Sequence, residues 1–586
     1  MILFHKIMKE QNKNTVDLNI LRHSLSHIMA HAVQDLYPGT KFGIGPAIEN
    51  GFYYDFGLDK NFTPEDLPKI ESKMRELIRK DLPFEKEVIP KEKAQEIFKN
   101  QPYKLELIKE LPEKEITVYK SGNFLDLCGG PHIKSTKEIP TDAFKLQKTA
   151  GAYWRGSEKN PMLQRIYGLA FENKKALEDY LKLQQEAEKR DHRILGQKLD
   201  LFFIDEEVGA GLPIWQHNGT ILRKVITDYL YEELSRQKYL WIISPHIGRL
   251  QLWKTSGHWE NYRENMYSPI KIEEEEYMIK PMNCPFHVKV YKTKIRSYRD
   301  LPIKYAEFGT VYRYERSGTL HGLTRVRGFT QDDAHIICRT KQLQEEVEKL
   351  LKTGFKIMKA FGFKDYDIYL STRPEKYAGT LQGWEKATNT LKSILEKLKL
   401  DFQEDQGGGV FYGPKIDIKI KDSLGRPWQC TTIQVDFNLP DKFKMEYVNE
   451  KGEKEKPLMI HRALIGSLER FIGVLLEHYA GNLPFWISPV QIQVIPISIK
   501  HKKYAKEIAD KLTENSLRCE LKDNNETISK KIREGEMQKI PYLLVVGDKE
   551  KKAKAVAVRK RGKGDLGMMK LNKFIEKVKI ESGRKS

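Results

Sequence analysis

The sequence predicts an α/β multidomain protein. Its 586 residues correspond to about three or four domains of roughly 100–200 residues each. Segments with helical periodicity alternate with short strand-like runs along most of the chain. Hydrophobic residues make up 40% and charged residues 31%, as in a globular protein. The longest apolar runs, GVLLEHYA and PYLLVVG, are too short to cross a bilayer, so no membrane segment is expected.

The first domain is expected to follow a short tail. Residues 1–20 are interpreted as this tail, and they lack the long apolar stretch of a signal peptide, which favours a cytoplasmic protein. The segment 21–37, LRHSLSHIMAHAVQDLY, predicts a helix. Turns and short strands follow, and mixed helix and strand continue to residue 173, so one domain is expected over 21–173. The predicted helix has one apolar stripe: Leu21, Leu25, Ile28, Met29, Ala32 and Val33.

Two further domains are expected after a charged helix. KKALEDYLKLQQEAEKRDHRILGQKL predicts a linker helix, with the linker over 174–192. A large α/β region then extends over 193–483. From residue 484 to 586, apolar strands alternate with charged helices, which predicts a compact α/β domain with a mostly parallel sheet.

Charge and cysteine content restrict the partners. The net charge of +20 favours a polyanionic partner, and nucleic acid is the leading candidate, with a general lysine bias as the alternative. An odd number of cysteines and no export signal favour thiols that are catalytic, metal-binding or simply buried over disulfides. The cysteines are Cys128, Cys284, Cys338, Cys430 and Cys519.

A possible metal site is spread over two segments. PMNCPFH places Cys284 and His287 in the order C-x-x-H, and DDAHIICRT places His335 and Cys338 in the order H-x-x-C. Two cysteines and two histidines could close a tetrahedral structural zinc site. An open catalytic site and two unrelated buried thiols are the alternatives.

The stretch YAEFGTVYRYERSGTLHGLTRVRGFTQDDAH sets five charged residues among strand-forming residues. We expect strands to hold these arginines in fixed positions, where their planar forks can grip phosphate oxygens. A nearby glutamate can accept a hydrogen bond from the amine of a base. The alternative is a solvated face of alternating charges. The residues are Arg313, Glu315, Arg316, Arg325 and Arg327.

A second cluster lies in the first domain. HSLSH puts His23 and His27 on one helix face, and NFLDLCGGPHI supplies Cys128 and His132. These four residues suit either a zinc quartet or a hydrolytic pocket in which histidines position water. Unrelated surface histidines are the third possibility.

Several of these segments resemble class II aminoacyl-tRNA synthetases. ILRKVITDYLYEELSRQKYLWIISPHI is similar to the first class motif, while PMNCPFH, RVRGFTQDDAH, FYGPKIDIKI, WQCTTIQVDFNLP and HRALIGSLERF resemble threonyl-tRNA synthetases. The resemblance runs from residue 21 to near the C-terminus. It implies an antiparallel class II catalytic sheet with helices, an α+β editing domain and a C-terminal α/β anticodon-binding domain. It also implies a homodimer, formed through the first motif.

The resemblance implies activation of L-threonine with ATP and Mg²⁺, and transfer of the threonyl group to tRNA(Thr). Arg313 and Arg470 would be catalytic. The other residues that the resemblance implies for ATP binding are Glu315, Arg325, Gln429, Thr432 and Ser467. Those that it implies for threonine binding are Gln331, Asp333, Tyr412 and Gln434.

The resemblance also implies one zinc ion per subunit, bound by Cys284, His335 and His461. Three protein ligands leave a position open, which threonine's amino and hydroxyl groups would take. Valine lacks the hydroxyl and would be rejected. The closed site with His287 and Cys338 is the less favoured alternative, because its second pair is inverted and His461 stays unexplained.

HxxxH followed by CxGPH is similar to the family's editing motif, which removes serine from mischarged tRNA. Serine keeps the hydroxyl and is smaller, so a second hydrolytic site is the expected remedy. The resemblance implies catalytic roles without metal for His23, His27, Cys128 and His132. Tyr54 and Asp126 are weaker candidates for the same pocket.

The chain departs from the family pattern in three places. Many bacterial members carry a ubiquitin-like TGS module before the editing domain, and we expect it to be lacking here because only about 20 residues precede His23. Thr431 stands where the family often has glycine or alanine, which puts the fit around the nucleotide in doubt. Phe286 is a variable position. The contrasting functional hypothesis is a catalytically silent RNA-binding or regulatory paralogue.

Overall fold

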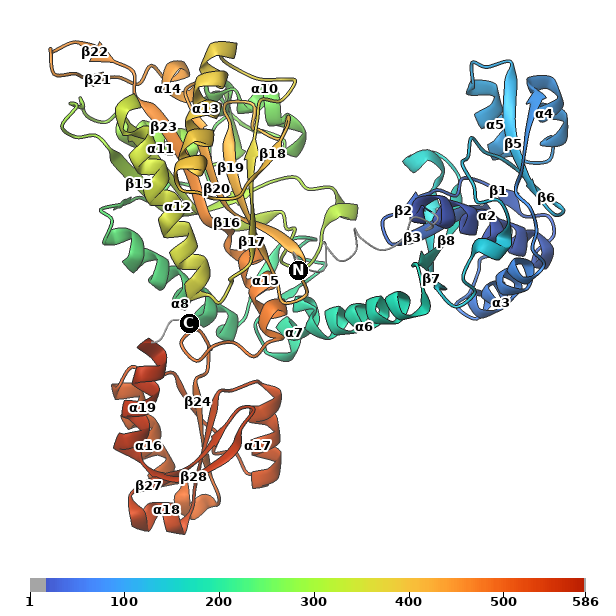
Figure 1. Ribbon diagram of the computed structural model, residues 1–586. Coiled ribbons are helices and arrows are strands. Elements are labelled where there is room, and N and C mark those ends of the chain that lie inside the picture. Colours follow the sequence, from blue (N-terminus) through green and yellow to red (C-terminus); the bar gives the residue numbers. More distant parts are fainter. Residues whose placement is uncertain (1–16, 59, 584–586) are drawn as a thin grey trace. The chain divides into compact units, whose positions relative to one another are not determined.

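The computed structural model describes residues 17–58 and 60–583 (Figure 1). The chain divides into two compact units, Met1–Gln185 and Glu186–Ser586. The division falls inside helix α6 (Lys174–Arg190), in which Leu177 is the one buried residue. This exposed, charged helix is the predicted linker. Of the expected tail, residues 1–16 lie outside the described residues, and 18–20 already belong to helix α2 (Leu18–Leu36).

The first unit is built around helix α2 and a five-stranded antiparallel sheet. The predicted apolar stripe of α2 is buried against the sheet, opposite Phe52, Tyr54 and Phe56 of strand β3. Helix α3 (Asp66–Arg79) completes this core. The strands are β1 (Lys41–Phe42), β3 (Gly51–Gly57), β8 (Met162–Ala170) and β7 (Phe144–Tyr153), with β2 (Ala47–Ile48) paired to β3.

A smaller antiparallel sheet completes the first unit. It consists of β4 (Glu85–Pro90), β5 (Glu115–Ser121) and β6 (Phe124–Leu127), with α4 (Lys91–Ile97) and α5 (Pro102–Glu110). After β6 the chain turns through a cis peptide bond between Gly130 and Pro131. The unit is therefore of the predicted α+β type.

An eight-stranded sheet organises the second unit, in the order β11-β15-β16-β23-β20-β19-β17-β18. The pairs in the middle of this order, from β15 to β17, are all antiparallel, as predicted. Only the outer pairs β11–β15 and β17–β18 are parallel. The strands are β11 (Leu240–Trp241), β15 (Ile303–Tyr312), β16 (Gly328–Cys338), β17 (Tyr366–Ser371), β18 (Gln403–Asp405), β19 (Lys415–Lys421), β20 (Pro427–Asp436) and β23 (Leu458–Ser467).

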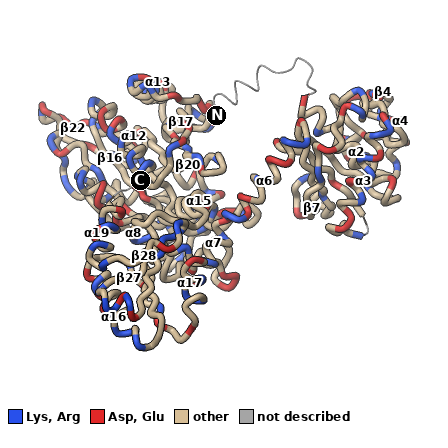
Figure 2. Tube along the Cα trace, turned by 60° about the horizontal axis from the view of Figure 1, so that its bottom comes forward, with Lys and Arg blue, Asp and Glu red and all other residues tan. Residues whose placement is uncertain are grey.

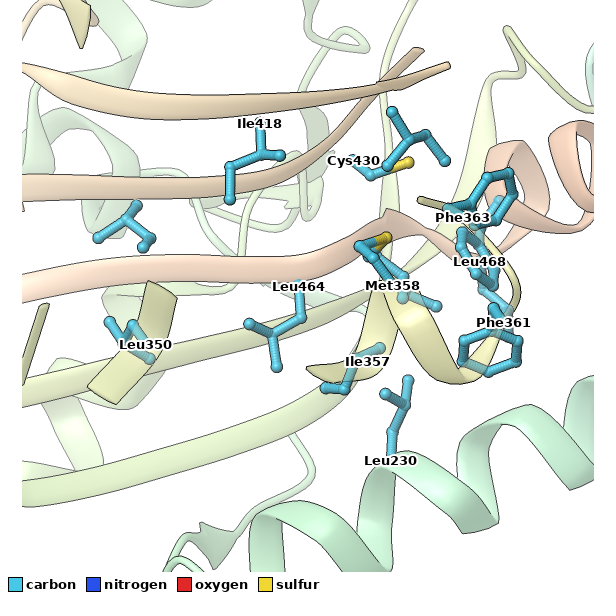
Figure 3. Packing of buried hydrophobic residues seen from close by; sticks show 14 of the residues in the cluster. Leu230, Leu350, Ile357, Met358, Phe361, Phe363, Ile418, Cys430, Leu464 and Leu468 are labelled. Atoms are coloured by element: carbon cyan, nitrogen blue, oxygen red, sulfur yellow. The ribbon is translucent and has the colours of Figure 1, made fainter. Parts of the chain in front are cut away.

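Four helices contribute to the hydrophobic core on one face of this sheet. They are α8 (His217–Ser235), α12 (Leu343–Ala360), α13 (Leu381–Lys397) and α15 (Leu468–Tyr479). Figure 3 shows Leu230 of α8 and Ile357 of α12 in the same core as Ile418, Cys430 and Leu464 from three strands. Since side chains alternate along a strand, every second residue of β16 and β23 points away from this core. The functional residues lie on that second face.

Shorter elements surround the sheet. Helix α7 (His192–Lys198) leads from the linker into the unit, and β21 (Tyr447–Val448) pairs with β22 (Lys454–Glu455). The others are β9 (Phe202–Ile204), β10 (Pro213–Trp215), β12 (Ile247–Arg249), β13 (Ile270–Ile272), β14 (Glu275–Ile279), α9 (Gln251–Ser256), α10 (His258–Tyr262), α11 (Cys284–Tyr291) and α14 (Leu439–Lys442).

The C-terminal part has a five-stranded sheet in the order β25-β24-β26-β27-β28, with α16 and α19 packed in one core. The prediction of a mostly parallel sheet was wrong, because β26–β27 and β27–β28 are antiparallel. Residues 547–554 are too few for a parallel crossover. The elements are β24 (Ile492–Pro496), α16 (Lys502–Glu514), β25 (Cys519–Leu521), α17 (Ile528–Met537), β26 (Tyr542–Val546), α18 (Asp548–Ala553), β27 (Ala555–Lys560), β28 (Gly564–Lys570) and α19 (Leu571–Gly583).

No helix among residues 17–58 and 60–583 is both long and apolar enough to cross a membrane. Figure 2 shows Lys and Arg interleaved with Asp and Glu over both units. The net charge of +20 is therefore not gathered in one block of sequence.

Candidate active site

A cavity of about 550 Å³ opens on the sheet face opposite the helices. Strands β16, β20 and β23 supply much of its lining, and the start of α15 supplies Ser467 and Arg470. Most of the residues implied for ATP, threonine and zinc therefore meet in one place. Those that line the cavity are Cys284, Arg313, Gln331, Asp333, Tyr412, Gln429, Thr432, Gln434, His461, Ser467 and Arg470.

Cys284, His335 and His461 form one buried cluster. Their ligand atoms all lie within 4.8 Å of one another. His335 and His461 are register partners on the adjacent strands β16 and β23, and Cys284 starts helix α11. His335 Nε2 lies 3.0 Å from His461 Nδ1. One sulfur and two imidazole nitrogens at this spacing match the donor set of an open tetrahedral zinc site.

The outer nitrogens of both histidines are already used. His461 Nε2 lies 2.8 Å from Asp436 Oδ2, so it carries the proton and donates to the carboxylate. On the other side, His335 Nδ1 lies 2.9 Å from His287 Nδ1, and His287 Nε2 lies 3.2 Å from Glu307 Oε2. Donation from His335 to His287 and from His287 to Glu307 satisfies each contact. The remaining lone pairs of His335 and His461 then face each other, as metal ligation requires.

The electrostatics of the cluster agree with this arrangement. Burial, and then the neighbouring imidazoles of His287 and His461, hold the pKa of His335 well below its usual value, so its ring is neutral. Burial raises the pKa of Cys284 well above its usual value. A thiolate at this position therefore needs a cation beside it.

The closed four-ligand site is not formed. His335 and Cys338 are three residues apart on strand β16, so they point to opposite faces of the sheet. Cys338 packs in the hydrophobic core on the helix side, and burial raises its pKa to about 12. The closed site would have required residues 335–338 to be helical, because only a helix would put His335 and Cys338 on one face. His287 contacts the cluster only through His335.

The implied ATP half of the cavity is centred on Arg470. Ser467 caps helix α15, because its Oγ accepts a hydrogen bond from the Arg470 backbone N–H at 3.2 Å. The Arg470 side chain donates through Nε to the Thr324 carbonyl oxygen at 3.0 Å. Burial, and then the positive charges of Arg313 and Arg325, lower the pKa of Arg470. The helix N-terminus and these guanidinium groups together favour an anion.

Two of the residues implied for ATP do not line the cavity. Glu315 and Arg325 pair with each other, with Arg325 Nε 3.0 Å from Glu315 Oε2. The structure also corrects where the charged residues lie. Arg313, Glu315, Arg316, Arg325 and Arg327 belong to the loop between β15 and β16, not to the strands. Hydrogen bonds fix this loop instead, such as Arg327 Nε to the Glu315 carbonyl oxygen at 2.9 Å.

The residues implied for threonine binding lie next to the cluster of Cys284, His335 and His461. Asp333 Oδ2 accepts a hydrogen bond from Asn283 Nδ2 at 3.0 Å, and its other oxygen lies 3.9 Å from His335 Nε2. The Tyr412 ring stacks on His461 with centroids 4.9 Å apart, and its hydroxyl donates to Gln434 Oε1 at 2.5 Å. With Oε1 occupied, the Gln434 amide nitrogen remains available to donate to a ligand.

The implied nucleotide residues Gln429 and Thr432 share one acceptor. Both donate to Asp417 Oδ1, at 2.8 and 2.7 Å respectively. Thr431, which raised doubt about the nucleotide fit, points elsewhere: its hydroxyl donates to the Leu464 carbonyl oxygen at 2.6 Å, and it is fully buried. This position therefore does not crowd the cavity. Phe286, the other departure, packs edge-on against Trp253.

Sequence reasoning missed two buried groups near the cavity. Asp332 lies on the helix side of β16, where it accepts hydrogen bonds from the backbone N–H groups of Leu464, Ile465 and Gly466 at 2.8–3.1 Å. It thereby holds the last residues of strand β23 before Ser467. His258 lies edge-on to Tyr412, and its Nε2 has no hydrogen-bond partner in the described structure. Burial lowers the pKa of His258 to about 3. In the sequence, the adjacent pair Asp332 and Asp333 could have pointed to Asp332, because two neighbouring residues of a strand face opposite sides.

A second candidate site lies in the first unit. His23 and His27 of helix α2 meet Cys128 and His132 of the loop after β6, with one ligand atom from each within 4.8 Å of the others. Cys128 Sγ lies 3.4 Å from His23 Nε2 and 3.3 Å from His132 Nε2. The predicted cluster is therefore assembled, and the reading of unrelated surface histidines was wrong.

A buried carboxylate organises the floor of this cluster. Asp126 Oδ2 lies 3.5 Å from His27 Nδ1 and accepts the Tyr54 hydroxyl at 2.6 Å. Lys104, which sequence reasoning missed, pairs with the other oxygen at 2.5 Å and donates to the Tyr54 oxygen at 3.0 Å. Tyr54 and Asp126 thus belong to the same pocket, as expected. Lys104 had no signal, because it lies in an ordinary charged helix, α5.

The protonation states suit neutral side chains that position water. Burial, and then the charges of His27 and His23, lower the pKa of His132 to about 2. Burial raises the pKa of the Cys128 thiol to about 11. Neutral imidazoles can accept a proton, while the thiol stays protonated at neutral pH.

Three sequence families match the chain. The tRNA synthetase class II core domain (G, H, P, S and T) matches residues 267–479, and an anticodon-binding domain matches residues 491–581. The threonyl and alanyl tRNA synthetase second additional domain matches residues 116–167, the part that contains Cys128 and His132.

Curated relatives match over nearly the whole chain. The threonine–tRNA ligase of Sulfurihydrogenibium sp. (strain YO3AOP1) is 54% identical over 98% of this chain and 90% of its own length. That of Aquifex aeolicus (strain VF5) is 51% identical over 96% and 89%. The RNA-binding domain of threonyl-tRNA synthetase from Cryptosporidium parvum Iowa II is a similar solved structure. It has a TM-score of 0.64 at 43% identity and covers 67% of this chain and 98% of its own. The chain belongs to the threonine–tRNA ligase family of class II aminoacyl-tRNA synthetases.

Proposed function

We propose that the protein works as a threonine–tRNA ligase through the two sites described above. It activates L-threonine with ATP, transfers the threonyl group to the 3′ end of tRNA(Thr), and hydrolyses mischarged seryl-tRNA(Thr). The observation that carries this is a single cavity whose lining includes Arg313 and Arg470 together with Cys284 and His461 of the buried cluster. ATP and the amino acid can therefore meet in it.

Arg313 and Arg470 are the proposed catalytic residues of activation. The threonine carboxylate attacks the α-phosphorus of ATP and pyrophosphate leaves, so negative charge shifts onto the phosphate oxygens. Preorganised guanidinium groups stabilise this charge without rearranging. Glu315, Arg325, Gln429, Thr432 and Ser467 are proposed to hold the nucleotide. Mg²⁺ is expected with ATP, as it neutralises the departing pyrophosphate.

Cys284, His335 and His461 are proposed to hold one Zn²⁺ ion. Zinc, when bound, supplies a Lewis-acid position that recognises the amino and hydroxyl groups of threonine. Asp333 is placed to receive the ammonium group, and Gln331, Tyr412 and Gln434 are proposed to complete the pocket. An amino acid without a hydroxyl leaves these polar partners unpaired, which is the physical basis for excluding valine.

His23, His27, Cys128 and His132 are proposed to catalyse editing without a metal. Neutral histidines orient and deprotonate a water that attacks the seryl ester carbon, and the alcohol oxygen of the tRNA leaves with a proton. The pair of Asp126 and Lys104 holds His27 and Tyr54 in place. Editing is assigned to residues 21–173, activation to 193–483 and anticodon binding to 484–586, with 174–192 as the linker.

A homodimer is proposed to form through the first class motif. Around helix α8 and strands β11 and β12, large apolar side chains face solvent in the single chain, and Ile243 is 96% exposed. Exposed apolar side chains that lie together are typical of protein–protein contact sites. The others are Tyr231, Leu240 and Ile247. Ile243→Glu is expected to give a monomer in sedimentation analysis. A cytoplasmic location is proposed, as for an enzyme that charges tRNA.

The decisive experiment is threonine-dependent exchange of pyrophosphate into ATP, measured with and without a zinc chelator. Exchange that needs threonine, fails with valine and is lost with the chelator supports the proposal. No exchange with zinc supplied would overturn it and leave a silent RNA-binding paralogue. Release of serine from seryl-tRNA(Thr) tests the editing site separately.

A further inference from the structure

His192, the first residue of helix α7, is fully buried where the linker enters the second unit. Its Nδ1 lies 2.6 Å from Glu477 Oε1, and its Nε2 lies 2.9 Å from the backbone nitrogen of Leu323. A backbone N–H can only donate, so Nε2 is the acceptor and Nδ1 carries the proton. Both ring nitrogens are thus occupied, which leaves none for a metal between Asp191, His192 and Glu477.

The ring is enclosed from two sides. A Cβ atom added to Gly322 would lie 2.2 Å from His192 Nε2, and Gly322 has a φ of +47°. A Cβ atom added to Gly473 of helix α15 would lie 3.3 Å from His192 Cδ2. The loop between β15 and β16 therefore rests directly on the imidazole, and the imidazole rests on α15.

This loop carries groups of the proposed ATP site. Thr324 follows Leu323, and its carbonyl oxygen accepts the hydrogen bond from Arg470 Nε at 3.0 Å. Arg325 comes next and pairs with Glu315 at 3.0 Å. Glu477, the other partner of His192, lies seven residues after Arg470 on the same helix, about two turns away. His192 thus joins the loop to the far end of the helix whose first turn holds Arg470.

We propose that His192 is a positioning residue for ATP binding: it fixes the loop backbone that aims Arg470 and Arg325, without touching ATP itself. Because α7 follows the linker helix α6 directly, the tether of the editing unit ends on this contact. The inference rests on the proposed ATP roles of Arg470 and Arg325.

The test is pyrophosphate exchange with ATP and threonine varied separately in the full-length, zinc-loaded enzyme. His192→Ala is expected to raise KM for ATP by roughly tenfold, as for one lost buried hydrogen bond, and to leave KM for threonine within about twofold. His192→Gln is expected to bring KM for ATP most of the way back to the parental value, because the glutamine side-chain carbonyl can accept the hydrogen bond from the Leu323 backbone N–H. In hydrogen exchange, the peptide with the Leu323 amide should exchange faster in His192→Ala only.

Gly322→Ala approaches the same contact from the loop and leaves α7 unchanged, so it stays informative if His192→Ala does not fold. The same rise in KM for ATP is expected. Leu195→Ala is the matched control: it removes another buried side chain of α7, which lies beside Gly481. It should lower stability and leave KM for ATP unchanged.

The outcomes separate the inference from the proposed function. Arg470→Ala must raise KM for ATP, and if it does not, the ATP assignment itself fails. If Arg470→Ala behaves as expected but neither His192→Ala nor Gly322→Ala changes KM for ATP, the positioning role is overturned. Parallel increases in both KM values, matched by Leu195→Ala, would also overturn it, since they indicate general loss of structure.

Discussion

His335 and His461 are direct neighbours across strands β16 and β23, with Nε2 of one 3.0 Å from Nδ1 of the other. Their outer nitrogens are held by His287 and by Asp436. Two lone pairs that face each other in a buried site repel unless a cation lies between them. The hydrogen-bond pattern around the two histidines thus has the form that zinc needs.

Replacing His461 with alanine is expected to remove both zinc and threonine activation. Loss of a ligand should cost more than the roughly 10–100-fold typical of an outer contact. Metal content by mass spectrometry and pyrophosphate exchange measure the two effects.

Cys338→Ala is the matched control, because Cys338 lies in the core on the opposite face of β16. It should keep one zinc per chain. Zinc loss in this variant would contradict the three-ligand assignment and restore the closed site.

His287→Ala tests the outer contact. The variant should still bind one zinc per chain in excess metal, but with affinity lower by about 10–100-fold, because His335 loses the partner that orients it. Competition with a chromophoric chelator gives the affinity. An unchanged affinity would show that His287 only fills space.

Cys128→Ala is expected to separate editing from activation. Seryl-tRNA(Thr) should accumulate, since the thiol that contacts His23 and His132 is removed. Threonine-dependent exchange should stay at the parental level, because the proposed activation site belongs to the other unit. Rapid serine release by the variant would place editing elsewhere.

The Cys128 thiol is expected to react slowly with iodoacetamide at pH 8. Burial raises its pKa to about 11 from an ordinary value of 9.0, so its thiolate fraction falls by roughly 100-fold. Because the pKa is raised, reactivity should increase up to about pH 11. Peptide mapping after timed alkylation measures the rate, with glutathione as reference. A rate equal to that of glutathione at pH 8 would contradict the buried thiol.

The sequence predicted most of the candidate site, because its motifs are long and lie on regular elements. HRALIGSLERF places His461 on strand β23 and Arg470 on the following helix α15. Choosing between the open and closed zinc sites depended on whether 335–338 is strand or helix. The choice could be made only once the structure showed that residues 335–338 belong to strand β16.

Groups without a local pattern could not be predicted. Lys104 joins the proposed editing site from helix α5, and His192 reaches the loop between β15 and β16 across 131 positions of sequence. The Arg313–Arg327 segment was assigned to strands from its residue types, but its glycines and reversal of direction make it a loop. The C-terminal sheet was predicted as mostly parallel from its alternation of strands and helices. Helix α18 is too short to act as the crossover that this prediction required.

The alternation along strand β16 has a consequence for how this gene can change. Gln331, Asp333 and His335 face the cavity, while Asp332, Ala334 and Ile336 face the other side. A deletion of a single codon within the strand would exchange the two sets and bury the ligands in the hydrophobic core. A point substitution changes one of these positions, whereas a change in length displaces several of them together, so descendants of this gene are expected to keep the segment free of insertions and deletions.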